Sequence, residues 1–455
     1  MSGNYDQIVV LSLVQINAER ASTPGPHAGT DRCPGVLEVH RADDGGLVRI
    51  RVPGGMLAAG TLAAVAGWAE DLGNGRIELT VRSNLQLRGI APGAEHELAA
   101  RLTAHGLLPS PAHDKARNVT ASPMSGRDAL GAIDVRPLVG AIDRALCAEA
   151  GLAELPGRFL FALDDGRGDV AGTGADAGVL GLPGDRVALL LGGLDTGLRL
   201  PVVSAVPALL EVASAFLRQR PDPRTWRIAE LPGGPLSLLD DLVRLPGMVR
   251  ADPAEVPAHD VDAPLGRIGQ SGGLVALAVS VPLGELTPNR CRALAAAAHR
   301  DLVLMPGRSV LLPDLTPECA TAVAPGLVAA GLILDHGSPL LGVSACTGRP
   351  GCARALADVR ADATRLCAGP VSSVSVSAAT TASEGDGSDD RPGAARRTAV
   401  HWSGCARRCG RPTGPVIDVV AEPEGYQVFR DDRPIAAGTD AGAAHGAAIR
   451  ARCLR

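Results

Sequence analysis

The stretches that decide the fold of this chain are Cys346-Thr-Gly-Arg-Pro-Gly-Cys352 and Ser403-Gly-Cys405-Ala-Arg-Arg-Cys409-Gly-Arg-Pro412. Each contains two cysteines in a short glycine-bearing segment, with five residues between the first pair and three between the second. An iron–sulfur cube needs four thiolates that converge on one point, and two such loops can supply them. The spacing therefore predicts a 4Fe-4S site whose ligands are Cys346, Cys352, Cys405 and Cys409.

The same cysteines have less demanding interpretations. A structural zinc ion is one, although zinc sites usually contain cysteine pairs with two residues between them. Disulfides are another, but nothing marks the chain as secreted. Unrelated buried thiols are the third, because a free cysteine is often a small core residue. For Cys33, Cys147 and Cys367, which have no partner at ligand spacing, we expect this third role, and for His401 a partly exposed place in a loop.

Length and composition limit the classes of protein to which the chain can belong. A chain of 455 residues suggests about three domains, and 46% hydrophobic residues suit globular cores. Aromatic residues make up 2% and the net charge is −5, so neither base stacking nor a general attraction to nucleic acid is expected. No apolar run reaches the roughly 20 residues needed to span a bilayer. The apolar run 8–14 lacks the features of a signal peptide, so we expect a cytoplasmic protein without a membrane partner.

Changes in composition predict how the chain is divided. A mobile leader is expected at 1–30, where proline and glycine become frequent, and a disordered Ser/Ala/Gly-rich insertion at about 372–397. The rest divides into a first half-domain, a central α/β domain, a second half-domain and a C-terminal domain with the cysteine loops, at 31–100, 110–255, 262–336 and 337–455.

An internal repeat predicts the two half-domains. Gly45-Gly-Leu-Val48 and Gly272-Gly-Leu-Val275 each open a strand, a Pro/Gly turn and an Ala/Leu-rich helix. An Arg-Ser pair follows 37 residues after Gly45 and 36 residues after Gly272. Two copies of one α/β unit would pack as a pseudo-twofold pair around a shared cleft. In the first copy, helical spacing predicts one helix that contains Leu57, Leu62, Val65, Ala66, Ala69 and Leu72.

The segment 77–89 alternates apolar and polar residues and predicts a strand. One face carries Leu79, Val81, Leu85 and Leu87, and the other carries Thr80, Arg82, Asn84, Gln86 and Arg88. The polar face can be an ordinary exposed sheet face, which antiparallel sheets often have. It can also be a basic wall that binds carboxylates or another anion, because guanidinium groups pair with carboxylates through two parallel hydrogen bonds. Segment 46–52 alternates apolar and basic residues and predicts a half-buried strand.

Taken together, the four cysteines and the repeat resemble the nitrite/sulfite reductase superfamily. Its members have a cluster site with this cysteine spacing, two ferredoxin-like halves and an intervening domain. The resemblance covers roughly residues 31–440 and rests most on the segments around the cysteines, with 80–86 and Arg117-Asn118-Val119 as further matches. It implies an α+β fold with two pseudo-twofold-related ferredoxin-like half-domains plus 4Fe-4S domains of the nitrite/sulfite reductase type.

Within the superfamily, Arg32-Cys-Pro-Gly35 and Ser403-Gly-Cys-Ala-Arg-Arg-Cys409 resemble the precorrin-3B synthase family more than the reductases. Reductases usually have Cys-Pro-Asn-x-Cys at the second pair, and two lysines one residue apart that deliver protons. This chain has Ala406-Arg407-Arg408 between the cysteines and Arg158-Phe-Leu160 at the lysine positions. Arginine stays protonated and is a poor proton donor, so these departures argue against reduction of sulfite or nitrite.

The resemblance implies an oxygenase of aerobic cobalamin biosynthesis. Members of the family use dioxygen and electrons from a donor protein or a reductant such as NADH or NADPH to hydroxylate precorrin-3A at C20 and close a lactone. A mononuclear non-heme iron is implied beside the cluster, with its ligands unassigned, and siroheme is less expected. A siroheme-dependent nitrite/sulfite reductase and a non-catalytic tetrapyrrole-binding electron-transfer protein are the alternatives. The tetrapyrrole would be held by Arg82, Asn84, Gln86, Arg88, Arg117 and Arg158.

Overall fold

The computed structural model describes residues 31, 33–242, 245–256, 264–368, 398–412 and 414–453. The predicted leader, Arg32 and the predicted insertion lie outside the described residues. The described residues before Asp335, without Ala42–Asp44, form one compact unit, and Ala42–Asp44 with the residues from Asp335 onward form a second. The mixed α+β class predicted from the sequence is confirmed.

The first unit contains two five-stranded sheets of the same topology. The first has the order β1-β2-β5-β4-β14, formed by His40–Ala42, Gly45–Ile50, Leu85–Ile90, Ile77–Leu79 and Glu285–Leu286. The second has the order β12-β13-β16-β15-β3, formed by Gly266–Gly269, Val275–Ser280, Ser309–Leu315, Asp301–Met305 and Met56–Ala58. The repeat that the sequence suggests is therefore also present in the order of the strands.

Each of these sheets receives an edge strand from the other copy of the repeat. β3 follows β2 in the chain but pairs with β15, where Leu57 lies opposite Leu302. In return, β14 pairs with β4, where Leu286 lies opposite Ile77. All four side chains are at most 4% exposed and belong to one hydrophobic core, so the exchange joins the two copies into one body.

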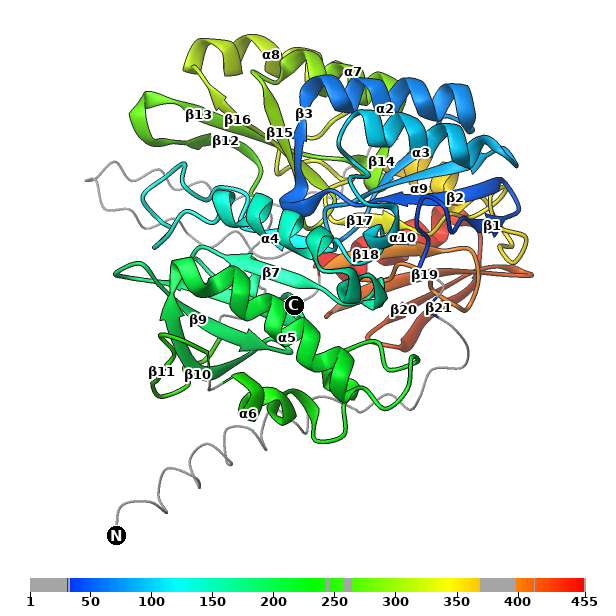
Figure 1. Cartoon of the computed structure of the whole chain (residues 1–455). Helices are drawn as coiled ribbons and strands as arrows, with labels where there is room; N and C mark the ends of the chain where they lie inside the picture. The colour runs from blue at the N-terminus through cyan, green and yellow to red at the C-terminus, as the bar shows by residue number, and fades with distance from the viewer. Residues whose placement is uncertain are drawn as a thin grey trace. The chain divides into compact units, whose positions relative to one another are not determined.

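Four helices lie together on one side of these sheets (Figure 1): α2 (Ala59–Leu72), α3 (Ala94–Ala104), α7 (Pro288–Ala297) and α8 (Pro317–Ala329). α2 packs against α7, and Leu62 and Leu294 are buried in the shared core. The predicted helix forms from Ala59 onward, because Leu57 is taken into β3. Thr287 and Thr316 are the N-cap residues directly before α7 and α8, and each side chain accepts a hydrogen bond from a backbone N–H of the first turn.

The prediction of one strand over 77–89 is wrong. The chain forms β4, turns at 80–84 and returns as β5, which pairs antiparallel with β4. The Thr80 N–H donates to the Asn84 carbonyl across this turn, and Ser83 adopts a φ of 58°. Val81, predicted on the apolar side, is 56% exposed in the turn. The two strands share one alternating pattern because both keep one face in the core.

The central part of the first unit is a six-stranded sheet with the order β11-β10-β9-β8-β7-β6, formed by Val249–Arg250, Leu194–Pro201, Arg186–Leu191, Ala177–Leu182, Phe161–Asp164 and Val119–Ala121. β6, β7 and β8 are parallel, and the remaining pairs are antiparallel. α4 (Arg136–Ala148), α5 (Ala205–Gln219) and α6 (Leu239–Leu242) accompany it (Figure 1). The stretch Val202–Gln219 is long and apolar enough to cross a membrane, but its Leu209, Val212 and Phe216 are buried in the core of this sheet.

The second unit contains a five-stranded sheet with the order β17-β18-β19-β20-β21, formed by Val343–Ala345, Ala399–Ser403, Val416–Glu422, Gly425–Arg430 and Arg433–Thr439. Its first three strands are parallel and its last two pairs are antiparallel. α9 (Val359–Ala368) lies between β17 and β18 in the chain, and α10 (Ala441–Cys453) follows β21. β6 to β10 with α4 and α5 have the same order and directions, so the chain contains this arrangement twice.

Replacing Leu286 by alanine tests the exchange of strands. Leu286 is fully buried where β14 meets β4, so we expect the variant to lose about 2–5 kcal/mol in free energy of unfolding through the cavity that it leaves. Chemical denaturation followed by circular dichroism measures this loss. Leu130→Ala is the matched control, because Leu130 is 76% exposed. Equal stability of the two variants would contradict the shared core.

Candidate metal centre and anion-binding residues

The two cysteine loops begin at one edge of the sheet in the second unit. Cys346 directly follows β17, and the loop with Cys405 and Cys409 follows β18. β17 and β18 are parallel neighbours with Ala345 opposite Trp402, and the Cys346 N–H donates to the Trp402 carbonyl at 2.9 Å. Because neighbouring parallel strands end at the same edge of a sheet, both loops leave it side by side.

Backbone hydrogen bonds hold the two loops together. The Gly404 N–H donates to Sγ of Cys346 at 3.1 Å, and the Gly404 carbonyl accepts from the Leu356 N–H at 2.7 Å. A side chain at position 404 does not fit, since its Cβ would lie 2.6 Å from that of Ala355. Burial raises the pKa of the Cys346 thiol, the Gly404 N–H opposes this shift, and the nearby Cys409 adds to it.

The four thiols suit an iron–sulfur cluster chemically. Cys346, Cys352 and Cys405 are half-buried, Cys409 is exposed, and all four are free thiols. Cluster sulfurs are commonly stabilised by backbone N–H donors, and one such donor already points at Cys346. Two adjoining loops with two thiols each therefore fit the predicted cofactor.

His401 is placed differently from the prediction. It lies within β18 and is fully buried instead of partly exposed in a loop. Its Nε2 lies 3.2 Å from the Cys409 carbonyl oxygen, and its Nδ1 lies 2.9 Å from the hydroxyl of Ser344 on β17. A carbonyl can only accept, so Nε2 carries the proton of the contact with Cys409. His401 therefore ties the Cys409 loop to the strand pair.

A buried carboxylate anchors the same loop. Asp418 on β19 is fully buried, and its Oδ2 accepts from Nη1 of Arg408 at 3.3 Å and from Nε of Arg411 at 2.8 Å. The Arg408 guanidinium also lies over the Phe429 ring, 4.3 Å from its centroid. The hydrogen bond to Asp418 raises the pKa of Arg411. These two arginines on either side of Cys409 are used to position the loop.

Among the six residues predicted to hold a carboxylated ligand, Arg82 and Arg158 are accessible. Arg82 is half-buried in the turn between β4 and β5, and its Nη1 donates to the Arg158 carbonyl at 3.1 Å. Arg158 is exposed, with its guanidinium 4.8 Å from the centroid of the Trp226 ring. Burial lowers the pKa of Arg82 to about 10, and the neighbouring Arg227 adds to the shift. A pKa of about 10 leaves Arg82 cationic at neutral pH.

The remaining polar residues of this segment face the protein interior, so an exposed sheet face is excluded. Asn84, Gln86 and Arg88 are 1%, 9% and 5% exposed. The Asn84 amide donates to Oδ1 of Asn118 at 3.1 Å, and the Gln86 amide donates to Oε2 of Glu78 at 2.9 Å. The polar face is therefore a buried network that supports the hairpin from inside.

Arg117 is held by an internal ion pair. It is 2% exposed, and its Nε and Nη2 donate to the two carboxylate oxygens of Asp143 on α4 at 2.7 and 2.9 Å. Its Nη1 donates to the Leu107 carbonyl at 2.8 Å. The edge of the guanidinium that would grip a ligand carboxylate is already taken. These contacts assign Arg117 a structural role in place of the predicted one.

Three residues that the sequence analysis did not assign to a site lie beside this region. Arg49 on β2 is half-buried, and Arg51, which directly follows β2, is 1% exposed. Cys33, expected to be an apolar buried thiol, is half-buried and close to both guanidinium groups. The signal for the arginines was the alternation over 46–52, but alternation cannot tell which basic side chain turns inward.

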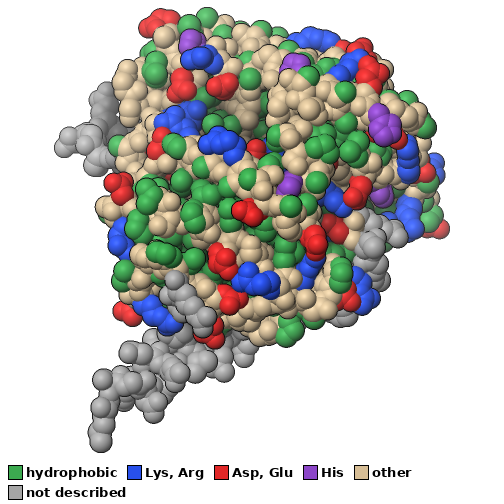
Figure 2. All heavy atoms as spheres, in the orientation of Figure 1, with side chains coloured by type: hydrophobic (Ala, Val, Ile, Leu, Met, Phe, Trp, Pro, Cys, Tyr) green, Lys and Arg blue, Asp and Glu red, His purple; other side chains and the backbone are tan. Residues whose placement is uncertain are grey.

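A hollow of about 410 Å³ in the first unit is lined by charged groups of both signs. Arg136 pairs with Asp134 at 2.7 Å, and Arg127 lies 3.5 Å from Asp314. Two of the cations that line the hollow are therefore already close to carboxylates of the chain itself. Figure 2 shows a similar interspersion of Lys/Arg with Asp/Glu side chains over the visible face.

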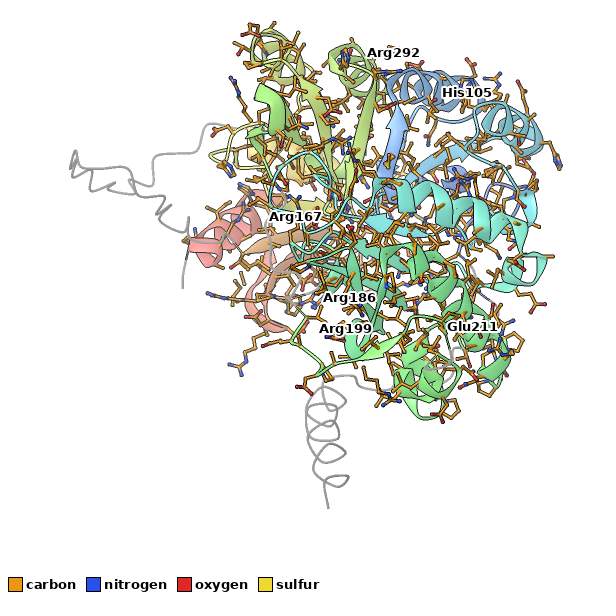
Figure 3. All side chains as sticks on the ribbon, turned by 60° about the vertical axis from the view of Figure 1, so that its left-hand side comes forward. His105, Arg167, Arg186, Arg199, Glu211 and Arg292 are labelled. Atoms are coloured by element: carbon orange, nitrogen blue, oxygen red, sulfur yellow. The ribbon has the colours of Figure 1, made fainter. Side chains whose placement is uncertain are left out.

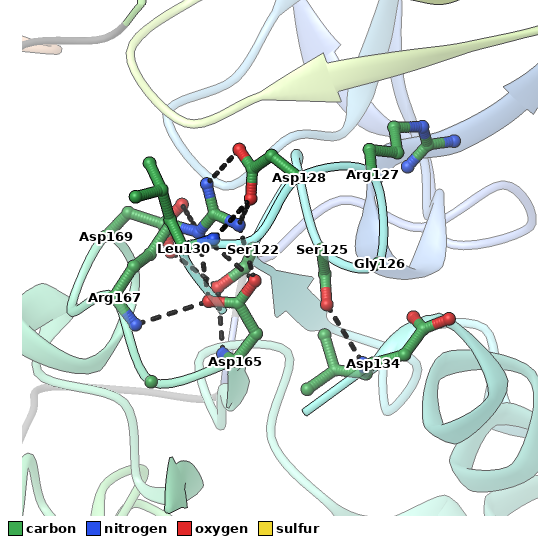
Figure 4. Close-up of polar contacts among 12 residues, drawn as sticks. Ser122, Ser125, Gly126, Arg127, Asp128, Leu130, Asp134, Asp165, Arg167 and Asp169 are labelled. Atoms are coloured by element: carbon green, nitrogen blue, oxygen red, sulfur yellow. Dashed lines mark hydrogen bonds and ion pairs between the residues drawn. The ribbon is translucent and has the colours of Figure 1, made fainter. Parts of the chain in front are cut away.

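The loop after β7, which carries Arg167 (Figure 3), gathers three carboxylates. Oxygen atoms of Asp164, Asp165 and Asp169 lie within 4.8 Å of one another. Arg167 donates to both Asp165 and Asp128 at 2.8 Å (Figure 4), and Asp164 accepts four backbone N–H groups. Burial raises the pKa of Asp169 to about 7, and Asp164 and Asp165 add to the shift. A guanidinium group therefore already supplies positive charge to this cluster.

This loop has the position in the central sheet that the second cysteine loop has in the other unit. Ser122 directly follows β6 and Asp165 directly follows β7, as Cys346 and Gly404 follow β17 and β18. The Asp165 N–H donates to Oγ of Ser122 at 3.1 Å, the same distance as from the Gly404 N–H to Sγ of Cys346. The two arrangements share a backbone geometry and differ in the side chains that they carry.

Comparisons with known proteins agree with this architecture. Residues 39–105 match the nitrite/sulfite reductase ferredoxin-like half domain. A ferredoxin–nitrite reductase of Synechococcus elongatus is 35% identical over 127 residues, which is 27% of this chain and only 25% of that enzyme's length. The solved structure of the NirA protein of Mycobacterium tuberculosis shares the fold, with a TM-score of 0.66 at 19% identity over 86% of this chain and 77% of that one. The chain therefore contains a nitrite/sulfite reductase ferredoxin-like half domain within a fold shared with NirA.

A further relative extends over most of the chain. A precorrin-3B synthase of Sinorhizobium sp is 29% identical over 363 residues, which cover 73% of this chain and 72% of that protein. The predicted resemblance to precorrin-3B synthase and to the nitrite/sulfite reductase superfamily is confirmed.

Replacing Asp169 by asparagine tests the raised pKa in the acidic loop. Between about pH 4 and pH 7 the folded protein holds a proton on Asp169 that the unfolded chain has released. The free energy of unfolding should therefore fall as the pH rises through this range, by roughly 2–4 kcal/mol from this group. Asp169→Asn should lack that fall, and Asp185→Asn, at an exposed carboxylate, should keep it. Denaturation curves at several pH values measure it, and parallel curves for the wild type and Asp169→Asn would refute it.

Proposed function

We propose that this chain is an oxygenase of the precorrin-3B synthase type. It would hydroxylate precorrin-3A at C20 and close a lactone, with dioxygen as co-substrate and electrons from a donor protein or a nicotinamide such as NADH. The alignment with a precorrin-3B synthase over 73% of the chain is the observation that carries this proposal. We expect the activity in the cytoplasm, where thiolate ligands stay reduced.

A 4Fe-4S cluster on Cys346, Cys352, Cys405 and Cys409 would supply one-electron transfer. The chain contributes the position of its ligands. The parallel strand ends bring the two loops together, and the Gly404 N–H favours negative charge on the Cys346 sulfur. His401 and Asp418 fix the backbone on either side of Cys409, so the loop has a defined shape of its own.

Arg82 and Arg158 are the residues proposed to pair with carboxylates of the tetrapyrrole. A guanidinium fork matches a carboxylate in geometry and charge, and both groups are accessible in the first unit. Asn84, Gln86 and Arg88 would act indirectly, because their buried contacts hold the hairpin that presents Arg82.

The first unit also favours oxygenation over reduction of sulfite or nitrite. Where reductases have two proton-delivering lysines, this chain has Arg158 and Leu160, and Leu160 is 3% exposed. Arginine does not release its proton at working pH, and leucine has none to give. A reduction that consumes several protons would lack its donors here. We assign no ligands to a mononuclear iron.

Cys346→Ser tests the cluster assignment. Serine is a poor ligand for cluster iron, so we expect iron and acid-labile sulfide to fall to background and the broad visible absorption to disappear. Cys319→Ser is the matched control, because Cys319 is an exposed free thiol on α8. Full iron and sulfide content in Cys346→Ser would contradict the assignment of Cys346 as a cluster ligand.

A single incubation tests the reaction. Anaerobically purified protein is mixed with precorrin-3A and a reductant, and isotopically labelled dioxygen is then admitted. We expect a product that has gained labelled oxygen, and none without the reductant. Strong siroheme bands in the purified protein together with turnover of nitrite or sulfite would instead establish the reductase alternative.

A further inference from the structure

Trp402 is a buried indole whose backbone lies beside both cysteine loops. It is fully buried on β18, and only Ser403 and Gly404 separate it from Cys405 in the chain. Its carbonyl accepts the N–H of Cys346 at 2.9 Å, so it is one hydrogen bond away from the other loop. Tryptophan is among the side chains that lose an electron most easily. An oxidisable ring is therefore built into the strand that leads to the candidate metal centre.

Tyr426 on β20 lies against the ring of Trp402. The two ring centroids are 5.4 Å apart and the planes meet at 75°, so the edge of one ring faces the other. Tyr426 is 5% exposed, and the contact is closed to water. Two aromatic rings at this separation can exchange an electron without a carrier between them.

The composition of the chain does not lead one to expect such a pair. Aromatic residues make up 2% of the sequence, which contains three tryptophans and two tyrosines. The other two tryptophans meet different groups. Trp68 packs edge-on against His105, and the guanidinium of Arg158 lies over Trp226. Trp402 is thus the tryptophan that packs against a tyrosine, and it is also the one beside the cysteine loops.

The phenol of Tyr426 has a proton acceptor. Its hydroxyl donates to Oδ2 of Asp362 on α9 at 2.5 Å. Asp362 is half-buried and also pairs with Arg365, whose side chain is 69% exposed, so the carboxylate lies near the surface. Burial raises the pKa of Tyr426, and the hydrogen bond to Asp362 adds to the shift. The phenol therefore keeps its proton at neutral pH and loses it only together with an electron.

The indole of Trp402 has no such acceptor. Its Nε1 is buried and has no hydrogen-bond partner within the part of the chain that the structure describes. His445 on α10 stacks on the ring at 6.3 Å between centroids, and burial lowers the pKa of this imidazole, which keeps it uncharged. An oxidised indole that cannot release its proton stays a cation radical, which is a stronger oxidant than the neutral radical. The two environments therefore give electron transfer a direction, from Tyr426 to oxidised Trp402.

We propose that Trp402 and Tyr426 form a one-electron relay that removes oxidising equivalents from the cysteine loops, with Asp362 as its proton acceptor. An oxidant derived from dioxygen takes one electron from the indole. Tyr426 returns an electron to the indole and passes its hydroxyl proton to Oδ2 of Asp362, which leaves a neutral tyrosyl radical and a carboxylic acid. A one-electron reductant such as ascorbate then restores the phenol, and the proton returns from Asp362.

The relay would protect the thiols of the two loops. Thiolates are oxidised stepwise to sulfinic and sulfonic acids, which do not return to thiols by themselves. Cys409 is exposed and the other three cysteines are half-buried, so an oxidant formed nearby can reach them. The source of this oxidant rests on the function proposed above, because an oxygenase that meets dioxygen without its substrate forms such species. The path from Trp402 to Asp362 rests on the contacts alone.

Pulse radiolysis tests the relay whether or not the protein holds a metal. Azide radicals oxidise tryptophan selectively, and electron transfer from tyrosine appears as a decay of tryptophanyl absorption with a matching rise of tyrosyl absorption. We expect this transfer in the wild type and in Tyr5→Phe, and its loss in Tyr426→Phe. Tyr5→Phe is the matched control, because the chain has two tyrosines and each variant removes one hydroxyl. No transfer in the wild type, or equal transfer in Tyr426→Phe, overturns the proposal.

Two further variants test the steps on either side of Tyr426. Trp402→Phe keeps a ring but removes the indole, so the tyrosyl yield should fall to background, whereas Trp68→Phe should keep it. Asp362→Asn removes the base and should slow the tyrosyl rise. Asp431→Asn is its control, because Asp431 is an exposed carboxylate between β20 and β21. Wild-type yield in Trp402→Phe overturns the relay, and a wild-type rate in Asp362→Asn overturns the role of Asp362.

Exposure to dioxygen tests the link to the proposed function. Purified protein is mixed with reductant and air without a tetrapyrrole, frozen, and examined by electron paramagnetic resonance. We expect a tyrosyl signal in the wild type and Tyr5→Phe, and in Tyr426→Phe no signal and a faster loss of acid-labile sulfide. Transfer after pulsed oxidation without a signal after dioxygen supports the relay while the oxidant of the proposed function fails. Equal sulfide loss in Tyr426→Phe and Tyr5→Phe overturns the protective role.

Discussion

β17 and β18 run parallel and in register, and this pairing is the constraint on which the candidate redox centre depends. Cys346 and Gly404 are 58 residues apart in the chain, yet the sheet brings them within one hydrogen bond. The contacts of His401 and Asp418 then limit where Cys409 can lie. A metal centre at this edge would be held by a backbone already shaped through strand pairing, so little ordering entropy would be lost when it binds.

In the first unit, the exchange of β3 and β14 has a similar organising effect. The chain leaves the first sheet after Ile50 and enters the second at Met56, so the residues between must cross the interior. Arg51 lies on this crossing, which accounts for its burial. The hairpin with Arg82 is supported by hydrogen bonds of Gln86 to Glu78 and Arg49. A cationic region next to a hydrophobic core therefore follows from the connectivity of the two copies.

The sequence predicted those features that depend on spacing and repetition. The two cysteine pairs indicated adjoining loops, and the repeat indicated two related sheets. It could not predict the turn at 80–84, because the hairpin preserves the alternation of a single strand. Nor could it assign the arginines, since the partner of Arg117 is Asp143 on a later helix, and the burial of Arg51 arises from a crossing that only tertiary structure defines. The sequence pattern shows which residues are charged, but only their tertiary contacts show whether they bind a ligand or support the fold.

The repeated strand arrangement has a consequence for where such a centre can form. In one copy the loop after the first parallel strand begins with Cys346, whose sulfur accepts from the Gly404 N–H. In the other copy it begins with Ser122, whose hydroxyl oxygen accepts from the Asp165 N–H. In the acidic version Arg167, a cation of the chain itself, pairs with Asp165 and Asp128. The same backbone arrangement therefore carries thiol side chains in one copy and an ion-paired acidic loop in the other. The cluster proposed for one copy would thus need no counterpart in the other, where ion pairs within the chain hold the corresponding loop.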